Sequence, residues 1–136
     1  MDFRAMSKEV APEVIELRHD FHQHPEASMA EFRTTDRIAE ELDKMGIPYR
    51  RFDPTGLIAT IQGGQPGKTV ALRADIDALS ITETADVPFK SQNEGFMHAC
   101  GHDTHAAMLL GAAMILNKIK DQLKGTVKLL FQPAEE

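Results

Sequence analysis

Apolar side chains recur at helical spacing close to the amino terminus of the chain. The positions are Val10, Val14, Leu17 and Phe21. They predict a first helix over residues 11–24, with Pro12 in its first turn and Pro25 as its stop. Three histidines lie within residues 19–24. We interpret them as a solvated helix end, because no carboxylate or thiol lies at ligand spacing.

A second amphipathic segment follows. Ser28 and Glu31 have the spacing of a capping box, and Gly46 supplies a stop. The apolar positions between them are Phe32, Ile38, Leu42 and Met45. This pattern predicts a second helix with one apolar face.

Three short β-strands are predicted next, over residues 49–52, 57–61 and 69–72. Residues 53–56 and 63–67 separate them and have the glycine and proline content of turns. The third strand runs directly into Arg73-Ala74-Asp75-Ile76-Asp77. Residues 81–96 then predict a long irregular connection, which is uncommon unless it serves a site.

Residues 106–119 are apolar almost all round, which predicts a helix buried on several sides. Asp103 or Thr104 can cap its start, and an apolar strand over residues 127–131 follows it. A buried helix between two apolar strands predicts a βαβ unit, and hence an α/β fold with a parallel core.

This topology brings the ends of both strands and the start of the helix to one edge of the sheet. Ligands of open α/β sheets collect at that edge. The residues expected within reach of each other there are Asp75, Cys100, His102, Glu135 and Glu136.

Composition narrows the class of protein. The 136 residues have the size of one domain, and a net charge of −6 argues against nucleic acid or an anionic membrane as partner. No apolar run has membrane-spanning length and no signal peptide is recognisable, so we expect no membrane association. A single cysteine forms no internal disulfide, so we expect a cytoplasmic protein.

Residues 97–105 contain the only cysteine and three of the six histidines. A thiolate and imidazoles so close together suit a divalent ion such as zinc or manganese. Three other interpretations stay open. In the first, Cys100 is an ordinary buried apolar residue. In the second, it is a catalytic nucleophile paired with His102 or His105. In the third, the cluster is only a histidine-rich helix start.

A metal on Cys100, His102 and one glutamate would lower the pKa of a bound water from ~15.7 toward about 7. Because successive side chains at a strand end point in different directions, one of Glu135 and Glu136 would ligate while the other acts as a base. Asp75 would orient a ligand. The predicted reaction class is metal-assisted hydrolysis of an amide or ester.

Three segments, in this order, resemble the amino-terminal part of the N-acyl-amino-acid amidohydrolases. They are Arg73–Leu79, Met97–Asp103 and Phe131–Glu136, and residues 17–26 resemble the opening helix of the same branch. The branch includes hippurate hydrolases, indole-acetyl-amino-acid hydrolases and N-acetyldiaminopimelate deacetylases, within the aminoacylase and carboxypeptidase metallopeptidase family. Ser80 stands where most members have proline.

The resemblance implies that residues 1–136 form the amino-terminal portion of a zinc-peptidase-like, three-layer αβα catalytic domain with a mixed, largely parallel sheet. It implies two divalent ions, zinc or manganese with nickel or cobalt as alternatives. Cys100, His102 and Glu136 would be ligands, Glu135 the general base and Asp75 the aspartate beside the metals. His98 and His105 are not expected as ligands. The substrates would be N-acyl amino acids.

The family's fold continues for more than as much chain again. It adds two metal-binding histidines, further strands and a lid domain that commonly dimerises. We therefore expect a truncated chain that is inactive alone and exposes a strand edge, while the intact product is a metal-dependent amidohydrolase, homodimeric through the lid. The alternative is a short protein that binds metal or a partner without catalysis.

Overall fold

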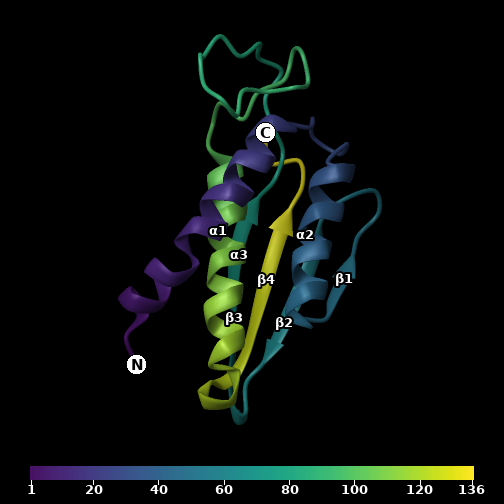
Figure 1. The fold of residues 1–136 in the computed structure, drawn as a ribbon. Helices are drawn as coiled ribbons and strands as arrows, with labels where there is room; N and C mark the ends of the chain where they lie inside the picture. Colours follow the sequence, from purple (N-terminus) through teal and green to yellow (C-terminus); the bar gives the residue numbers. More distant parts are fainter.

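The computed structural model describes all 136 residues as three helices, a 3₁₀ turn and one four-stranded sheet (Figure 1). In chain order the elements are α1 (Phe3–Gln23), α2 (Phe32–Met45), β1 (Tyr49–Arg51), β2 (Leu57–Gln62), β3 (Gln65–Asp75), α3 (His102–Lys118), the 3₁₀ turn Lys120–Gln122 and β4 (Lys124–Gln132). Each helix and strand predicted from the apolar pattern overlaps one of them. Residues 80–96 contain no helix or strand, as expected for the long connection.

The strand order is β1-β2-β4-β3. β3 and β4 are parallel and joined through α3, which confirms the predicted βαβ unit. β2 pairs antiparallel with both β1 and β4, so the sheet is mixed as predicted. β3–β4 is the one parallel pair among the four strands, so these residues do not show the largely parallel character that was expected. In that pair Asp75 lies opposite Gln132. The last residues of the two strands therefore reach the same edge of the sheet.

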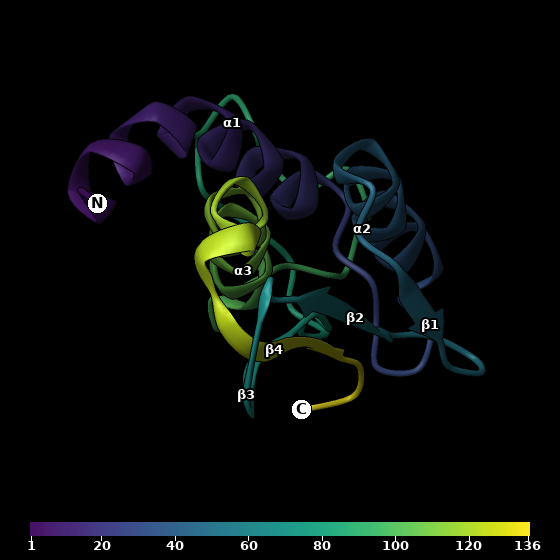
Figure 2. The ribbon, with the colours of Figure 1, turned by 90° about the horizontal axis from the view of Figure 1, so that it is seen from below.

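All three helices lie on one face of this sheet (Figure 2). α3 covers the strands, and α1 packs against α3 on the side away from them. The apolar positions that predicted α1 lie in this core, since Leu17 and Phe21 are fully buried together with Leu110 of α3. Phe131 of β4 closes the core from the sheet. The chain thus holds one helical side of the predicted three-layer arrangement.

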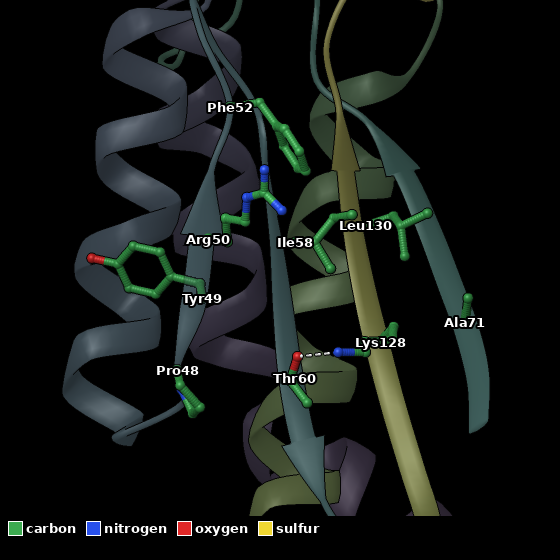
Figure 3. A pocket seen from close by; sticks show the side chains of 9 residues that line it. All are labelled: Pro48, Tyr49, Arg50, Phe52, Ile58, Thr60, Ala71, Lys128 and Leu130. Carbon is green, nitrogen blue, oxygen red and sulfur yellow. Dashed lines mark hydrogen bonds between the residues drawn. The ribbon is translucent and has the colours of Figure 1, made fainter. Parts of the chain in front are cut away.

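The other face of the sheet carries no helix (Figure 2). It has a hollow midway along the strands (Figure 3). Its lining residues are Pro48, Tyr49, Arg50, Phe52, Ile58, Thr60, Ala71, Lys128 and Leu130. Lys128 Nζ donates a hydrogen bond to Thr60 Oγ1 across it at 2.8 Å. The hollow has no carboxylate, imidazole or thiol. β3 is the last strand in the order, so one side of its backbone is unpaired, which is the exposed strand edge that was predicted. Two of its apolar side chains, Val70 and Leu72, are also exposed.

The start of α1 differs from the prediction. The helix begins at Phe3, where the Asp2 side chain accepts a hydrogen bond from the Ala5 amide at 3.1 Å. Pro12 therefore lies inside the helix and not in its first turn. Asp2 is a common N-cap residue, and the apolar stripe beginning at Val10 did not reveal it. No helix combines the length and the apolar character needed to cross a membrane.

Two predicted caps are wrong. At the start of α2, Ser28 Oγ donates a hydrogen bond to Asp77 Oδ2 at 2.7 Å, and the Glu31 side chain makes no cap bond. The Glu26 carboxylate instead accepts hydrogen bonds from the amides of Arg33 and Thr34, at 3.0 and 2.7 Å. α3 starts at His102 without any side-chain cap, and Asp103 is buried against α1. In each case a partner far along the chain competes for the polar side chain, and local spacing does not reveal such partners.

Candidate metal centre

The candidate site lies at the edge of the sheet where β3 and β4 end, the upper end of the molecule in Figure 1. Asp75 is the last residue of β3, and the segment 133–136 follows the last residue of β4. His102 is the first residue of α3, and Cys100 lies two residues before it. The expected meeting of two strand ends and a helix start is therefore present.

Two groups of possible metal-ligating side chains occur at this edge. Cys100, His102 and Glu136 each offer one atom, and these atoms lie within 4.8 Å of one another; Asp75, His102 and His105 form a second such group around the same imidazole. Glu135 Oε2 lies 3.4 Å from His102 Nε2. All five predicted site residues thus come together. His105, which the sequence did not indicate as a ligand, joins them through a 2.7 Å contact of its Nδ1 with Asp75 Oδ1.

The orientation of the buried His102 ring determines what this edge can bind. Its Nδ1–H donates to the Asp77 carbonyl oxygen at 2.8 Å, which leaves the lone pair of a neutral ring on Nε2. That nitrogen faces three carboxylates, with Asp75 Oδ2 at 3.3 Å, Glu135 Oε2 at 3.4 Å and Glu136 Oε1 at 3.6 Å. A lone pair and three carboxylates around one space make a donor set that fits a cation.

Asp77 holds the site together, although its place in the motif Arg73–Leu79 indicated no separate role for it. Its buried carboxylate accepts hydrogen bonds from Ser28 Oγ at 2.7 Å and from the amides of Glu135 and Glu136 at 3.1 and 3.0 Å. His102 Nδ1 also lies 3.2 Å from its Oδ1. Burial raises the pKa of Asp77, but these hydrogen bonds outweigh it and the pKa lies below its usual value. The signal in the sequence was a second aspartate two residues after Asp75.

The two glutamates do not diverge as predicted, because both carboxylates approach His102 Nε2. β4 ends at Gln132, and the chain then turns through Ala134, whose φ of 53° is left-handed. The alternation of side chains holds only within an extended strand, so it does not apply to residues 133–136. Glu136 joins the group of Cys100 and His102, and Glu135 is the more exposed of the two.

Cys100 is exposed and has acidic neighbours. Partial loss of hydration and the carboxylates of Glu136, Glu135 and Asp75 raise the pKa of its thiol. A catalytic cysteine requires the opposite, a pKa lowered by a cationic neighbour or a helix start. The interpretation of Cys100 as a nucleophile is therefore disfavoured. Binding to a metal would itself supply the positive charge that deprotonates the thiol.

The predicted solvated helix end is wrong for His22. This ring is buried, with Nδ1 2.8 Å from Asp103 Oδ2 and Nε2 2.7 Å from Glu83 Oε1. Arg18 Nε donates to the same Asp103 oxygen at 3.0 Å. The network ties the long connection and the first turn of α3 to α1. Glu83 and Asp103 are 61 and 81 residues away from His22 in the chain, so no local pattern could indicate them.

His98 is set apart from both groups of ligands. It is 5% exposed, and neither ring nitrogen has a hydrogen-bond partner. Burial lowers its pKa to about 4, so the ring is neutral at pH 7. His98 belongs to neither group of possible ligands.

Residues 71–136 match the sequence profile of Peptidase family M20/M25/M40. The chain is 52% identical to thermostable carboxypeptidase 2 of Saccharolobus solfataricus, over 95% of this chain and 33% of that protein. It is 47% identical to an N-acetylcysteine deacetylase of Bacillus subtilis, over 90% of this chain and 33% of that protein.

A solved structure of a dinuclear metal-binding peptidase of the M20 family, from Bacillus subtilis, superposes with a TM-score of 0.88. The two are 45% identical, and the match covers 97% of this chain and 36% of that one. The resemblance predicted from the three motifs is thereby confirmed. The chain spans about a third of the length of the curated relatives it matches.

Proposed function

We propose that the protein takes part in metal-dependent hydrolysis of the amide bond of N-acyl amino acids. One observation carries the proposal: Cys100, His102 and Glu136 converge within 4.8 Å in a chain related to dinuclear metal-binding peptidases. We assign these three side chains as ligands. Two divalent ions per intact site, zinc or manganese with nickel or cobalt as alternatives, would activate water and polarise the amide carbonyl.

The positions of the carboxylates support the remaining proposed roles. Glu135 is the most exposed of the three that face His102, so it is the one best placed to meet a substrate and to exchange protons as the general base. Asp75 is buried and bonded to His105, which suits an aspartate that orients its neighbours. Asp77 keeps the His102 ring in place through Nδ1.

The names of the relatives support one shared substrate chemistry. A carboxypeptidase cuts the last peptide bond of a chain, and an N-acetylcysteine deacetylase cuts the acyl bond of one amino acid. In both substrates the amide nitrogen belongs to an amino acid with a free carboxylate. We propose this class of amide for the present protein, in a cytoplasmic setting.

We also propose that residues 1–136 are the amino-terminal portion of the catalytic domain and are inactive by themselves. The sheet face without helices (Figure 2) and the coverage of only a third of the relatives support this. The two further histidines and the dimerising lid expected from the family would lie outside these residues. Metal-dependent release of an amino acid from an N-acyl substrate by the 136 residues alone would refute the claim of inactivity.

A chimeric protein tests the function itself. Residues 1–136 replace the matching third of the Bacillus subtilis N-acetylcysteine deacetylase, and release of cysteine is measured with and without chelator. We expect metal-dependent hydrolysis, reduced at least about a hundredfold by Glu135→Gln because the base is lost. Glu94→Gln, an exposed change in the long connection, is the matched control. A chimera that binds metal but hydrolyses equally well with Glu135→Gln contradicts the assignment.

A further inference from the structure

Glu31 is a buried carboxylate that the predicted capping box does not explain. It is 0% exposed at the start of α2 and makes no cap bond to that helix. Its two oxygens accept hydrogen bonds from Thr55 Oγ1 at 2.6 Å and from the Ala134 amide at 2.9 Å. Burial of a charge is unfavourable unless hydrogen bonds compensate it, so these two contacts define what the side chain does.

The contact with Ala134 lies at the turn that carries the two glutamates of the site. Ala134 has a φ of 53°, a left-handed conformation that is unfavourable for a residue with a Cβ atom and persists only where its surroundings hold it. Gly56 supports the turn from outside, since a Cβ there would lie 2.6 Å from Pro133 Cδ. Glu31 and Gly56, both far away in the sequence, thus shape the segment of residues 132–136.

Two buried carboxylates hold three consecutive amides of this segment. Glu31 accepts from Ala134, and Asp77 accepts from Glu135 at 3.1 Å and from Glu136 at 3.0 Å. The backbone sets the direction of the Cα–Cβ bond from which a side chain extends. Holding these amides therefore fixes the points from which the Glu135 and Glu136 side chains extend toward His102.

We propose that Glu31 is a positioning residue for Glu135 and Glu136 and acts through the Ala134 amide. It touches no reacting atom. The importance of the two glutamates rests on the proposed function, whereas the contact that holds their backbone does not. The competing explanation is that Glu31 only stabilises α2 and the loop at Thr55.

Substitutions at Glu31 and Glu26 separate the two explanations. Glu31→Met removes both acceptors at similar length, while Glu31→Gln can still accept from Ala134 and pair with a reoriented Thr55 hydroxyl. Glu26→Met is the matched control, because the Glu26 carboxylate binds the amides of the first turn of α2 and makes no hydrogen bond to residues 132–136. Cobalt affinity is measured for each by titration, alone and combined with Glu136→Ala.

We expect Glu31→Met to weaken cobalt binding about tenfold or more, as loss of a partner behind a ligand does, and Glu31→Gln to restore it to within about threefold. In the Glu136→Ala background Glu31→Met should have no further effect, because it acts through that ligand. An equal loss of affinity with Glu26→Met overturns the proposal, since both changes would then act through α2.

Amide hydrogen exchange in the presence of chelator tests the backbone contact without any metal. Exchange at Ala134 should rise about tenfold with Glu31→Met and stay unchanged with Glu26→Met. If Glu31→Met does not fold, Glu31→Asp carries the same expectation, because it keeps the charge but withdraws it by one methylene. Unchanged exchange at Ala134 overturns the proposal. If the unsubstituted chain binds no cobalt, the proposed metal site fails and the exchange result alone decides the role of Glu31.

Discussion

Acidification between pH 6.5 and 4 should destabilise the metal-free chain through His98. The buried ring has a pKa lowered from 6.5 to about 4, while the same ring in the unfolded chain takes up a proton near 6.5. The unfolded state therefore binds more protons throughout this window. Stability is full above pH 6.5 and is lost as the pH falls toward 4. At 1.36 kcal/mol per pKa unit, the loss is about 2 kcal/mol at pH 5 and about 3 kcal/mol at pH 4.

The assay is urea unfolding at pH 7 and pH 5 with chelator present, on the unsubstituted chain and on His98→Leu. The leucine cannot titrate, so the variant should lack the loss of about 2 kcal/mol between the two pH values. At pH 7 it should cost less than about 1.5 kcal/mol, because the ring nitrogens give up no hydrogen bond. The adjacent Met97→Leu keeps His98 and should keep the loss. If His98→Leu is as sensitive to acid as the unsubstituted chain, the reasoning is wrong.

Three further outcomes follow from the structure. Leu110→Ala, at a fully buried position of α3, should lower the free energy of unfolding by about 2–5 kcal/mol in a denaturant titration, and a loss under about 1 kcal/mol would contradict the described core. Asp77→Asn should weaken zinc binding about 10–100-fold by calorimetry, because it disturbs the orientation of His102; unchanged affinity would remove the positioning role of Asp77. Zinc affinity should rise with pH above neutrality in the same titration. The raised pKa of Cys100 keeps the thiol protonated until a metal displaces the proton, so Cys100→Ser should lose this pH dependence.

The sequence predicts those parts of the fold that depend on periodic patterns. Leu17 and Phe21 lie in the core at the spacing that predicted α1, and β3, α3 and β4 form the βαβ unit that the apolar runs indicated. The meeting of Asp75 with His102 follows from that topology alone, since parallel strand ends and the intervening helix start share one edge.

Polar side chains with distant partners are where the sequence was insufficient. His22 was interpreted as a solvated helix end and is buried between Asp103 and Glu83. Glu31 was interpreted as half of a capping box and instead holds Ala134, 103 residues further along the chain. A buried polar group requires a partner, but its identity depends on packing that a local pattern does not contain.

Cobalt titration of the chain tests the central claim most directly, because a thiolate bound to cobalt gives a sulfur-to-metal absorption that reports Cys100 itself. We expect a saturable thiolate signal that disappears with Cys100→Ser and weakens at least about tenfold with Glu136→Ala. Glu94→Ala, on the exposed connection, should leave it unchanged. The absence of a thiolate signal at millimolar cobalt, or a signal of equal strength with Glu136→Ala, would contradict the convergence of Cys100, His102 and Glu136 on one metal.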